Sequence, residues 1–199
     1  MDRLEMIRRI TAQPPAQPRI ACFDFVSEEI FSAALSDAMS SGELRGADGA
    51  RSAELSDEAI RTALAERKLP VRATAGSAGY DFFSPLSFRL LPGDSMTIPT
   101  GVRCAMDPNY ILMIAPKSGK GSRYRVMLRN TLAFIDSDYY FSDNEGHIVL
   151  KLINDNYDGI PMDIRAGDSL MQGILLPYGV TIDDASTGVR NGGFGSTVR

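Results

Sequence analysis

The sequence predicts a mainly β protein that carries a small α-helical insertion near its N-terminus. Beyond residue 70, short apolar runs alternate with turn signals that contain Gly or Pro, a spacing typical of an all-β sandwich or barrel. Before residue 70, two segments instead carry apolar residues at helical spacing. The pattern changes near Leu69 and Pro70, so we place the boundary between the helical segment and the β domain there.

The first residues are expected to form an arm and then one strand. Residues 1–18 end in Gln-Pro-Pro-Ala-Gln-Pro, a composition typical of a flexible, extended linker. Residues 19–26 read Arg-Ile-Ala-Cys-Phe-Asp-Phe-Val, and their aromatic and β-branched content favours a strand.

Two helices are expected to follow this strand. Ser27 is a suitable N-cap for a helix that extends to about residue 40, and Val26 and Phe31 are placed as a hydrophobic staple. Residues 41–54 are rich in Gly, Ser and Ala and predict a loop. Ser56 is expected to cap a second helix, which Pro70 would end. Residues 19–68 therefore read as a strand with a two-helix insertion.

Within the β domain, residues 69–188, three apolar segments are the clearest strand predictions: 96–98, 110–115 and 147–152. The only histidine, His147, begins the last of them and is expected to be a strand or surface residue. Cys22 and Cys104 lie inside apolar runs and are expected to be small core residues in a reducing compartment, which favours the cytoplasm.

Composition argues against several classes of function. The chain of 199 residues has a net charge of −4, whereas a protein that coats nucleic acid needs a basic face. No apolar run is long enough to span a membrane, and the N-terminus has no apolar segment of the secretory type. We therefore expect no nucleic-acid partner, no membrane span and a cytoplasmic location.

The C-terminal residues 189–199 form a Gly-rich segment suited to closing over a phosphorylated ligand. Glycines leave the backbone free to approach a ligand, and successive amides can form an anion-binding nest. The segment also carries the hydroxyls of Ser196 and Thr197, the cationic Arg190 and the aromatic ring of Phe194. Gly195 lies between Phe194 and Ser196. Phosphate binding beside a stacking ring suggests a nucleotide, although a disordered polar tail is the alternative.

A second segment agrees with a nucleotide site. Residues 131–140 read Thr-Leu-Ala-Phe-Ile-Asp-Ser-Asp-Tyr-Tyr, so an apolar run leads directly into Asp136 and Asp138. Carboxylates two residues apart on an extended segment point to the same side. Near a polyphosphate, such a carboxylate can act as a general base toward water or help to hold Mg²⁺. The alternative is a turn capped by Asp.

With these segments in view, the chain resembles the homotrimeric dUTP diphosphatases (dUTPases), in a branch with an N-terminal helical extension. The resemblance covers residues 69–199 in five motifs, which occur in the family's order. They are Gly-Ser-Ala-Gly-Tyr-Asp at 76–81, Pro-Lys-Ser-Gly at 116–119, the segment 130–139, Gly-Asp-Ser-Leu-Met-Gln-Gly at 167–173, and Gly-Gly-Phe-Gly-Ser-Thr at 192–197.

The resemblance implies a jelly-roll-like β fold, three copies around a threefold axis, and active sites at the subunit interfaces. It implies hydrolysis of dUTP to dUMP and pyrophosphate, with Mg²⁺ on the triphosphate and water attacking the α-phosphorus. Residues 189–199 would be a lid that orders over the bound nucleotide. Each site would take phosphate-binding motifs from one subunit, the third motif from a second, and the tail from a third.

The resemblance also implies a role for each matching residue. Asp136 would activate the water, Tyr139 would pack under the deoxyribose and exclude a 2′-hydroxyl, and Asp81 would help to place Mg²⁺. The remaining assignments concern substrate binding: Lys117, Ser118, Gly119 and Gln172 at the phosphates, Asn130 and Ile135 in the hairpin that reads uracil through its backbone, Phe194 over the base, and Arg190, Gly195, Ser196 and Thr197 in the tail.

Several positions depart from the family pattern. Lys117 replaces an arginine and so lacks the planar fork that binds phosphate in a bidentate way. Residues 140–146 form a longer turn than is common, and Val198 replaces the usual closing glycine. A dCTP deaminase, which is similar in fold, would need a Glu where this chain has Lys151. A dUTP-binding regulatory protein is the other alternative.

Overall fold

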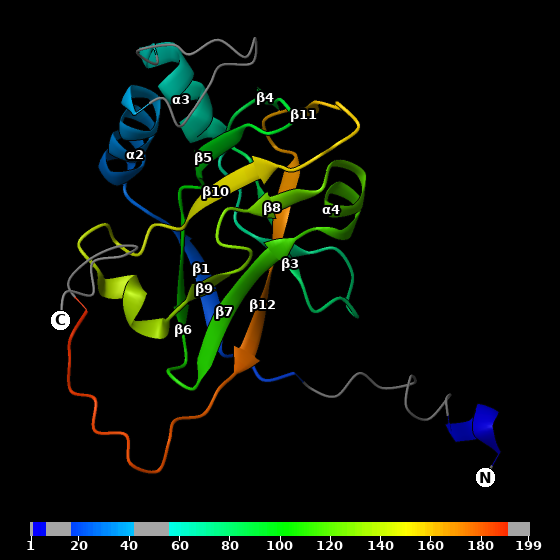
Figure 1. Cartoon of the computed structure of the whole chain (residues 1–199). Helices are drawn as coiled ribbons and strands as arrows, with labels where there is room; N and C mark the ends of the chain where they lie inside the picture. The colour runs from blue at the N-terminus through cyan, green and yellow to red at the C-terminus, as the bar shows by residue number, and fades with distance from the viewer. Residues whose placement is uncertain (1, 7–16, 42–55, 191–199) are drawn as a thin grey trace.

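The computed structural model describes residues 2–6, 17–41 and 56–190. The strands outnumber the helices, which confirms the mainly β prediction (Figure 1). The elements in chain order are β1 Ala21–Phe25, α2 Glu28–Ser40, α3 Asp57–Glu66, β2 Val71–Arg72, β3 Tyr80–Phe83, β4 Phe88–Leu90, β5 Ser95–Pro99, β6 Val102–Met106, β7 Tyr110–Pro116, α4 Ser118–Tyr124, β8 Val126–Leu128, β9 Ala133–Ile135, the 3₁₀ helix η1 Ser137–Phe141, β10 Val149–Asn154, β11 Met162–Ile164 and β12 Ser169–Pro177.

The strands form one five-stranded sheet and three smaller ones. The large sheet has the order β2-β3-β12-β7-β9, and the others are β5-β10-β8, β1-β6 and β4-β11. The strand pairs within these sheets are antiparallel, so each strand can hold one face toward the core. The core includes Phe82, Leu112, Ile114 and Leu150, each fully buried.

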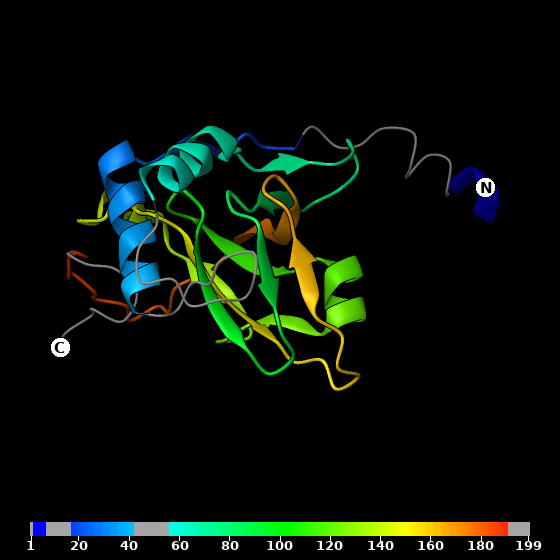
Figure 2. The ribbon, with the colours of Figure 1, turned by 90° about the horizontal axis from the view of Figure 1, so that it is seen from above.

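The helical insertion lies on one side of the sheets, away from α4 (Figures 1 and 2). Ser27 caps α2 as expected, since its hydroxyl accepts a hydrogen bond from the Ile30 amide at 3.3 Å. Val26 and Phe31, the expected staple, are both buried. Ser56 likewise caps α3 through the Ala59 amide.

The predicted end of the second helix at Pro70 is wrong. The helix α3 ends at Glu66 because Arg67 takes an extended backbone conformation, with φ −58° and ψ 135°. Arg67 then turns back to the start of the insertion, where its Nη1 donates to the Val26 carbonyl at 3.1 Å. The expected loop 41–54 lies outside the described residues, except for Ser41.

The expectations for His147 and Cys22 are also wrong. His147 is 1% exposed and precedes β10, and its Nε2 accepts a hydrogen bond from the Gly101 amide at 2.9 Å. Its burial lowers the pKa of the imidazole to about 4. Cys104 is buried as expected, but Cys22 is exposed. Cys104 lies opposite Phe23 in the β1–β6 pair, so Cys22, one residue earlier, points to the other face.

No helix within residues 2–6, 17–41 and 56–190 has the length and apolar character needed to cross a membrane.

Candidate active site

The first, second and fourth motifs meet at one end of the five-stranded sheet. Asp81 on β3 lies level with Gln172 on β12, which lies level with Ala115 on β7. Lys117, just beyond β7, donates from Nζ to Asp81 Oδ2 at 2.6 Å and to Ser169 Oγ at 3.1 Å. Antiparallel pairing therefore gathers residues from three distant parts of the chain into one cluster, in which the Lys117–Asp81 ion pair lies among polar side chains.

A glycine in the first motif makes room for the glutamine of this cluster. A Cβ on Gly79 would come within 2.6 Å of Gln172 Oε1. The Gln172 amide nitrogen in turn donates to the Pro116 carbonyl at 3.4 Å, at the end of β7. A larger residue at position 79 would push the glutamine out of this position.

Ser118 and Gly119 lie in the first turn of α4, directly after Lys117. Lys117 is the N-cap residue, and its side chain makes no capping hydrogen bond. The first amides of a helix have no partner inside the helix and point outward from its start. This turn therefore offers N–H groups beside the Lys117 ammonium, an arrangement suited to phosphate oxygens.

The third motif places its two carboxylates at the start of η1. Asp136 and Asp138 are half-exposed, and both form ion pairs with Arg190, the last described residue. Arg190 Nε lies 2.9 Å from Asp138 Oδ1, and its Nη2 contacts Asp136 Oδ2. The tail arginine thus reaches the third motif of its own chain, whereas the resemblance implies a tail and a third motif from different subunits.

Tyr139 is held by the long turn that follows it. Its ring is 3% exposed, and its hydroxyl donates to the His147 carbonyl at 2.9 Å and accepts from Asn144 Nδ2 at 2.8 Å. Burial raises the pKa of this hydroxyl. The Arg190 guanidinium lies 5.8 Å from the ring centroid. Asn144 therefore fixes the tyrosine, a role that no sequence signal had indicated.

The hairpin between β8 and β9 borders a pocket of about 230 Å³. The hairpin is tight, because the Thr131 amide donates to the Leu128 carbonyl at 2.8 Å and Thr131 takes a left-handed backbone with φ +71°. Ile135 on β9 is buried at 2% exposure. The pocket is lined by Leu128, Arg129, Asn130, Ala133, Val149 and Lys151. We call it the hairpin pocket; its volume suits a small planar ring.

The two clusters lie far apart within one chain. Asp136, which follows β9, comes level with Ile111 of β7, whereas Asp81 comes level with Ala115 through Gln172. Asp136 and Asp81 are therefore separated by four residues along β7 and by three strand spacings across the sheet. At about 3.3 Å per residue and about 4.8 Å per strand, the separation is roughly 20 Å.

Asp81 fits a metal that arrives with its substrate. Among the residues described, no group of three or more His, Cys, Asp or Glu side chains could hold a metal ion. Mg²⁺ keeps several waters and commonly binds through one or two carboxylates together with substrate phosphates. One carboxylate, 15% exposed and beside Lys117, suits that mode better than a permanently bound ion.

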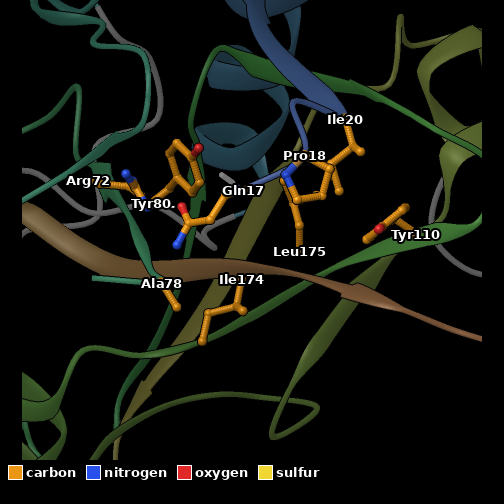
Figure 3. Close-up of a pocket in the computed structure, with 9 residues that line it drawn as sticks. All are labelled: Gln17, Pro18, Ile20, Arg72, Ala78, Tyr80, Tyr110, Ile174 and Leu175. Carbon is orange, nitrogen blue, oxygen red and sulfur yellow. Dashed lines mark hydrogen bonds between the residues drawn. The ribbon is translucent and has the colours of Figure 1, made fainter. Parts of the chain in front are cut away.

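A second pocket, of about 260 Å³, lies under the N-terminal residues 17–20 (Figure 3). Arg72 Nη1 donates to Gln17 Oε1 at 2.7 Å at one side of it, and Tyr80 and Tyr110 lie at its walls. None of the residues predicted for the site lines this pocket.

Four of the predicted tail residues, Phe194, Gly195, Ser196 and Thr197, lie outside the described residues. Sequence reasoning missed Ser169 and Asn144 as site residues. Ser169 stands inside the fourth motif, three residues before Gln172, the strand partner of Asp81, so its position was a usable signal.

Comparisons with known proteins agree on one family. The sequence model of the dUTPase family matches residues 65–198. The deoxyuridine 5'-triphosphate nucleotidohydrolase of Lactococcus lactis is 33% identical over 132 residues, which span 65% of this chain and 87% of the relative. That of Haemophilus influenzae strain PittEE is 34% identical over 138 residues, with the same coverage. The crystal structure of dUTPase from Streptococcus mutans is similar with a TM-score of 0.52 at 30% identity, covering 58% of this chain and 90% of that one. The chain therefore belongs to the dUTPase family.

Proposed function

We propose that the chain hydrolyses dUTP to dUMP and pyrophosphate in the cytoplasm. Family membership supports this activity, and so does the position of Asp136 directly after β9, the short strand that borders the hairpin pocket. Ala133 lines the pocket and Asp136 follows three residues later, roughly 10 Å along the strand. A nucleotide whose base lies in the pocket would therefore direct its 5′-phosphates toward Asp136.

In this mechanism Asp136 is the general base. One carboxylate oxygen accepts a proton from water while the water oxygen attacks the α-phosphorus. The bond from the α-phosphorus to the bridging oxygen breaks, and pyrophosphate leaves. Asp136 is half-exposed, so water can reach its carboxylate.

The phosphates are assigned to the cluster at Lys117. Its ammonium supplies a point charge, the first turn of α4 at Ser118 and Gly119 supplies amides, and Gln172 supplies a carboxamide. Asp81 would hold Mg²⁺ beside them, and the metal would neutralise part of the charge that develops on the phosphates. Lys117 must then release Asp81 or share it.

The separation between the two clusters supports a site built from more than one subunit. A distance of roughly 20 Å is far beyond the reach of one triphosphate that must touch both Asp136 and Asp81. A closed ring of identical subunits brings one patch of a chain against a different patch of its neighbour. We therefore propose a homotrimer with its active sites at the subunit interfaces, as the resemblance implies.

The tail, residues 189–199, is assigned to a lid that follows the β domain, residues 69–188. Residues 1–18 are assigned to an N-terminal arm, and residues 19–68 to the first strand with its helical insertion. Beyond β12 the chain runs as an exposed segment that passes η1 before it reaches Arg190 (Figure 1). The Arg190 ion pairs are partly exposed, and such pairs stabilise by about 1 kcal/mol or less, so substrate can displace them. When Arg190 leaves, the Asp136 carboxylate would be free to act as general base, and the face of the Tyr139 ring would be free to bind the sugar.

Pyrophosphate release, measured with dUTP, dCTP, dTTP and UTP, tests this function. We expect release from dUTP alone, and no ammonia from dCTP, because Lys151 stands where a deaminase needs a carboxylate. Ammonia from dCTP would instead support a deaminase. Binding of dUTP without any pyrophosphate release would support the regulatory alternative.

A further inference from the structure

Lys151 lies in the wall of the hairpin pocket, although neither the sequence motifs nor the mechanism above gives it a task. It sits on β10, where the Arg129 amide donates to its carbonyl at 2.8 Å and so joins β10 to the start of the hairpin. Val149 and Lys151 are two residues apart on the strand, so both side chains point to the same face and line the pocket together.

The pocket is lined by three apolar and three polar residues. Leu128, Ala133 and Val149 are the apolar residues, while Arg129, Asn130 and Lys151 bring side chains with hydrogen-bonding groups. A site of this composition orients its ligand through the few polar groups, because an apolar wall cannot tell one edge of a planar ring from another.

A protonated lysine has three donors and no acceptor. The pyrimidine 4-position offers an acceptor in a 4-keto base such as uracil, and an amino donor in cytosine. The ammonium can therefore bond to uracil O4, whereas cytosine would bring two donors together and leave both without a partner.

We propose that Lys151 is a specificity-determining residue, whose ammonium donates to O4 of the uracil base and rejects cytosine in the hairpin pocket. The proposal rests on the proposed function, since it assumes that the base of dUTP occupies this pocket. It assigns the uracil-over-cytosine preference to a side chain on β10, in addition to the hairpin backbone.

The test compares kcat/KM for dUTP and dCTP in the wild-type protein and in Lys151→Met, Lys151→Arg and Lys151→Gln. Lys151→Met keeps the length and removes the donors, so its kcat/KM for dUTP should fall about tenfold to a hundredfold, as expected for a hydrogen bond from a charged group. Its preference for dUTP over dCTP should narrow by at least about tenfold. Lys151→Arg should keep the preference, and Lys151→Gln, whose amide can also accept, should narrow it most.

Lys68→Met is the matched control, because Lys68 is exposed and lies beside the Phe83 ring rather than in the pocket. Competition by dUMP and dCMP against a labelled nucleotide gives a second readout that does not depend on turnover. The affinity for dUMP should fall in Lys151→Met, and that for dCMP should not.

Two outcomes overturn the proposal while leaving the proposed function intact. In one, Lys151→Met keeps the wild-type ratio of dUTP to dCTP turnover. In the other, kcat/KM falls by the same factor for dUTP and for dCTP, which would place the ammonium at the phosphates. Failure of the wild-type protein to hydrolyse dUTP would instead contradict the proposed function, and monophosphate competition would then decide whether Lys151 reads the base.

Discussion

Asp136 is proposed to act as the general base, and at the scale of one residue it gives the sharpest prediction. Replacing Asp136 with Asn keeps the shape and removes the base, so turnover of dUTP should fall by roughly 10² to 10⁴-fold while nucleotide binding persists. Stopped-time pyrophosphate assays measure the first quantity and calorimetry the second. Asp143→Asn, an exposed carboxylate in the following turn, should be neutral. Turnover near that of the wild type in Asp136→Asn would remove this residue from the role of base.

The ring and the hydroxyl of Tyr139 are expected to have different roles, one in substrate selection and the other in stability. Its ring is proposed to crowd the 2′ position of the sugar, while its hydroxyl bonds to the His147 carbonyl and to Asn144. Tyr139→Phe should therefore lower the free energy of unfolding by about 1 kcal/mol, yet keep the preference for dUTP over UTP. Tyr139→Ala should lose both stability and the preference for dUTP over UTP, the latter chiefly because UTP becomes an acceptable substrate. Parallel kcat/KM measurements decide this, and unchanged discrimination in Tyr139→Ala would refute the steric role.

His147 predicts how stability depends on pH. Its pKa is about 4 in the folded protein, against an ordinary value of 6.5, because it is buried, and Arg67 adds to this while Glu145 opposes it. Between these values the unfolded chain binds more protons, so stability is lost as pH falls from 6.5 toward 4. The loss should reach roughly 3 kcal/mol.

His147 is the only histidine, so one variant isolates its effect. His147→Gln retains an acceptor for the Gly101 amide but cannot gain the proton. Urea unfolding at a series of pH values should give a shallower dependence in this variant, since only its carboxylates still titrate. Parallel curves for the two proteins across that window would contradict the assignment.

Single residues also show what sequence could and could not reveal. The residues of the first, second and fourth motifs were assigned through the resemblance to the dUTPase family, and the structure brings Lys117 of the second motif against Asp81 of the first. The burial of His147 was not predictable, because its partner Gly101 is distant in sequence and polarity alone favours the surface. Cys22 was misplaced because an apolar run does not state which face of a two-stranded pair is covered.

At the scale of elements, the cap of α2 is the most local feature and gives a direct prediction. Ser27→Ala removes the hydroxyl that accepts the Ile30 amide and should lower the free energy of unfolding by about 1 kcal/mol. Ser36→Ala, within the same helix, should be neutral or slightly stabilising, because alanine favours helix interiors. Denaturant unfolding compares the two variants. Equal stability would mean that the cap contributes nothing measurable, and the amide of Ser27 would still be held by Glu145.

Helices and strands could be predicted from the sequence where interactions between residues close in the chain determine them. The caps at Ser27 and Ser56 and the strands at 96–98 and 110–115 were predicted near their observed bounds. Strand pairing was not, because nothing local indicates that β1 pairs with β6 or that β12 lies between β3 and β7. That order, rather than any motif, sets the distance between Asp136 and Asp81.

At the scale of the whole molecule, the helical insertion lies beside the site region. Glu145, in the turn after the third motif, accepts the Ser27 amide at 2.8 Å, and Asp37 of α2 lines a hollow together with Lys151. The insertion therefore supports the turn that holds Tyr139, and it faces the strand that borders the hairpin pocket. Sequence alone gave these residues no function.

Each active site is proposed to take Asp136 from one subunit and Asp81 from another. The most direct test mixes Asp136→Asn and Asp81→Asn, which should each have little activity on its own, by unfolding and refolding them together in equal amounts. Random assembly into a closed ring should leave roughly a quarter of the sites with both carboxylates, so about that fraction of wild-type activity should appear. If mixed oligomers form, as native mass spectrometry can show, and the activity stays at the level of the parents, then each subunit completes its own site and the account is contradicted.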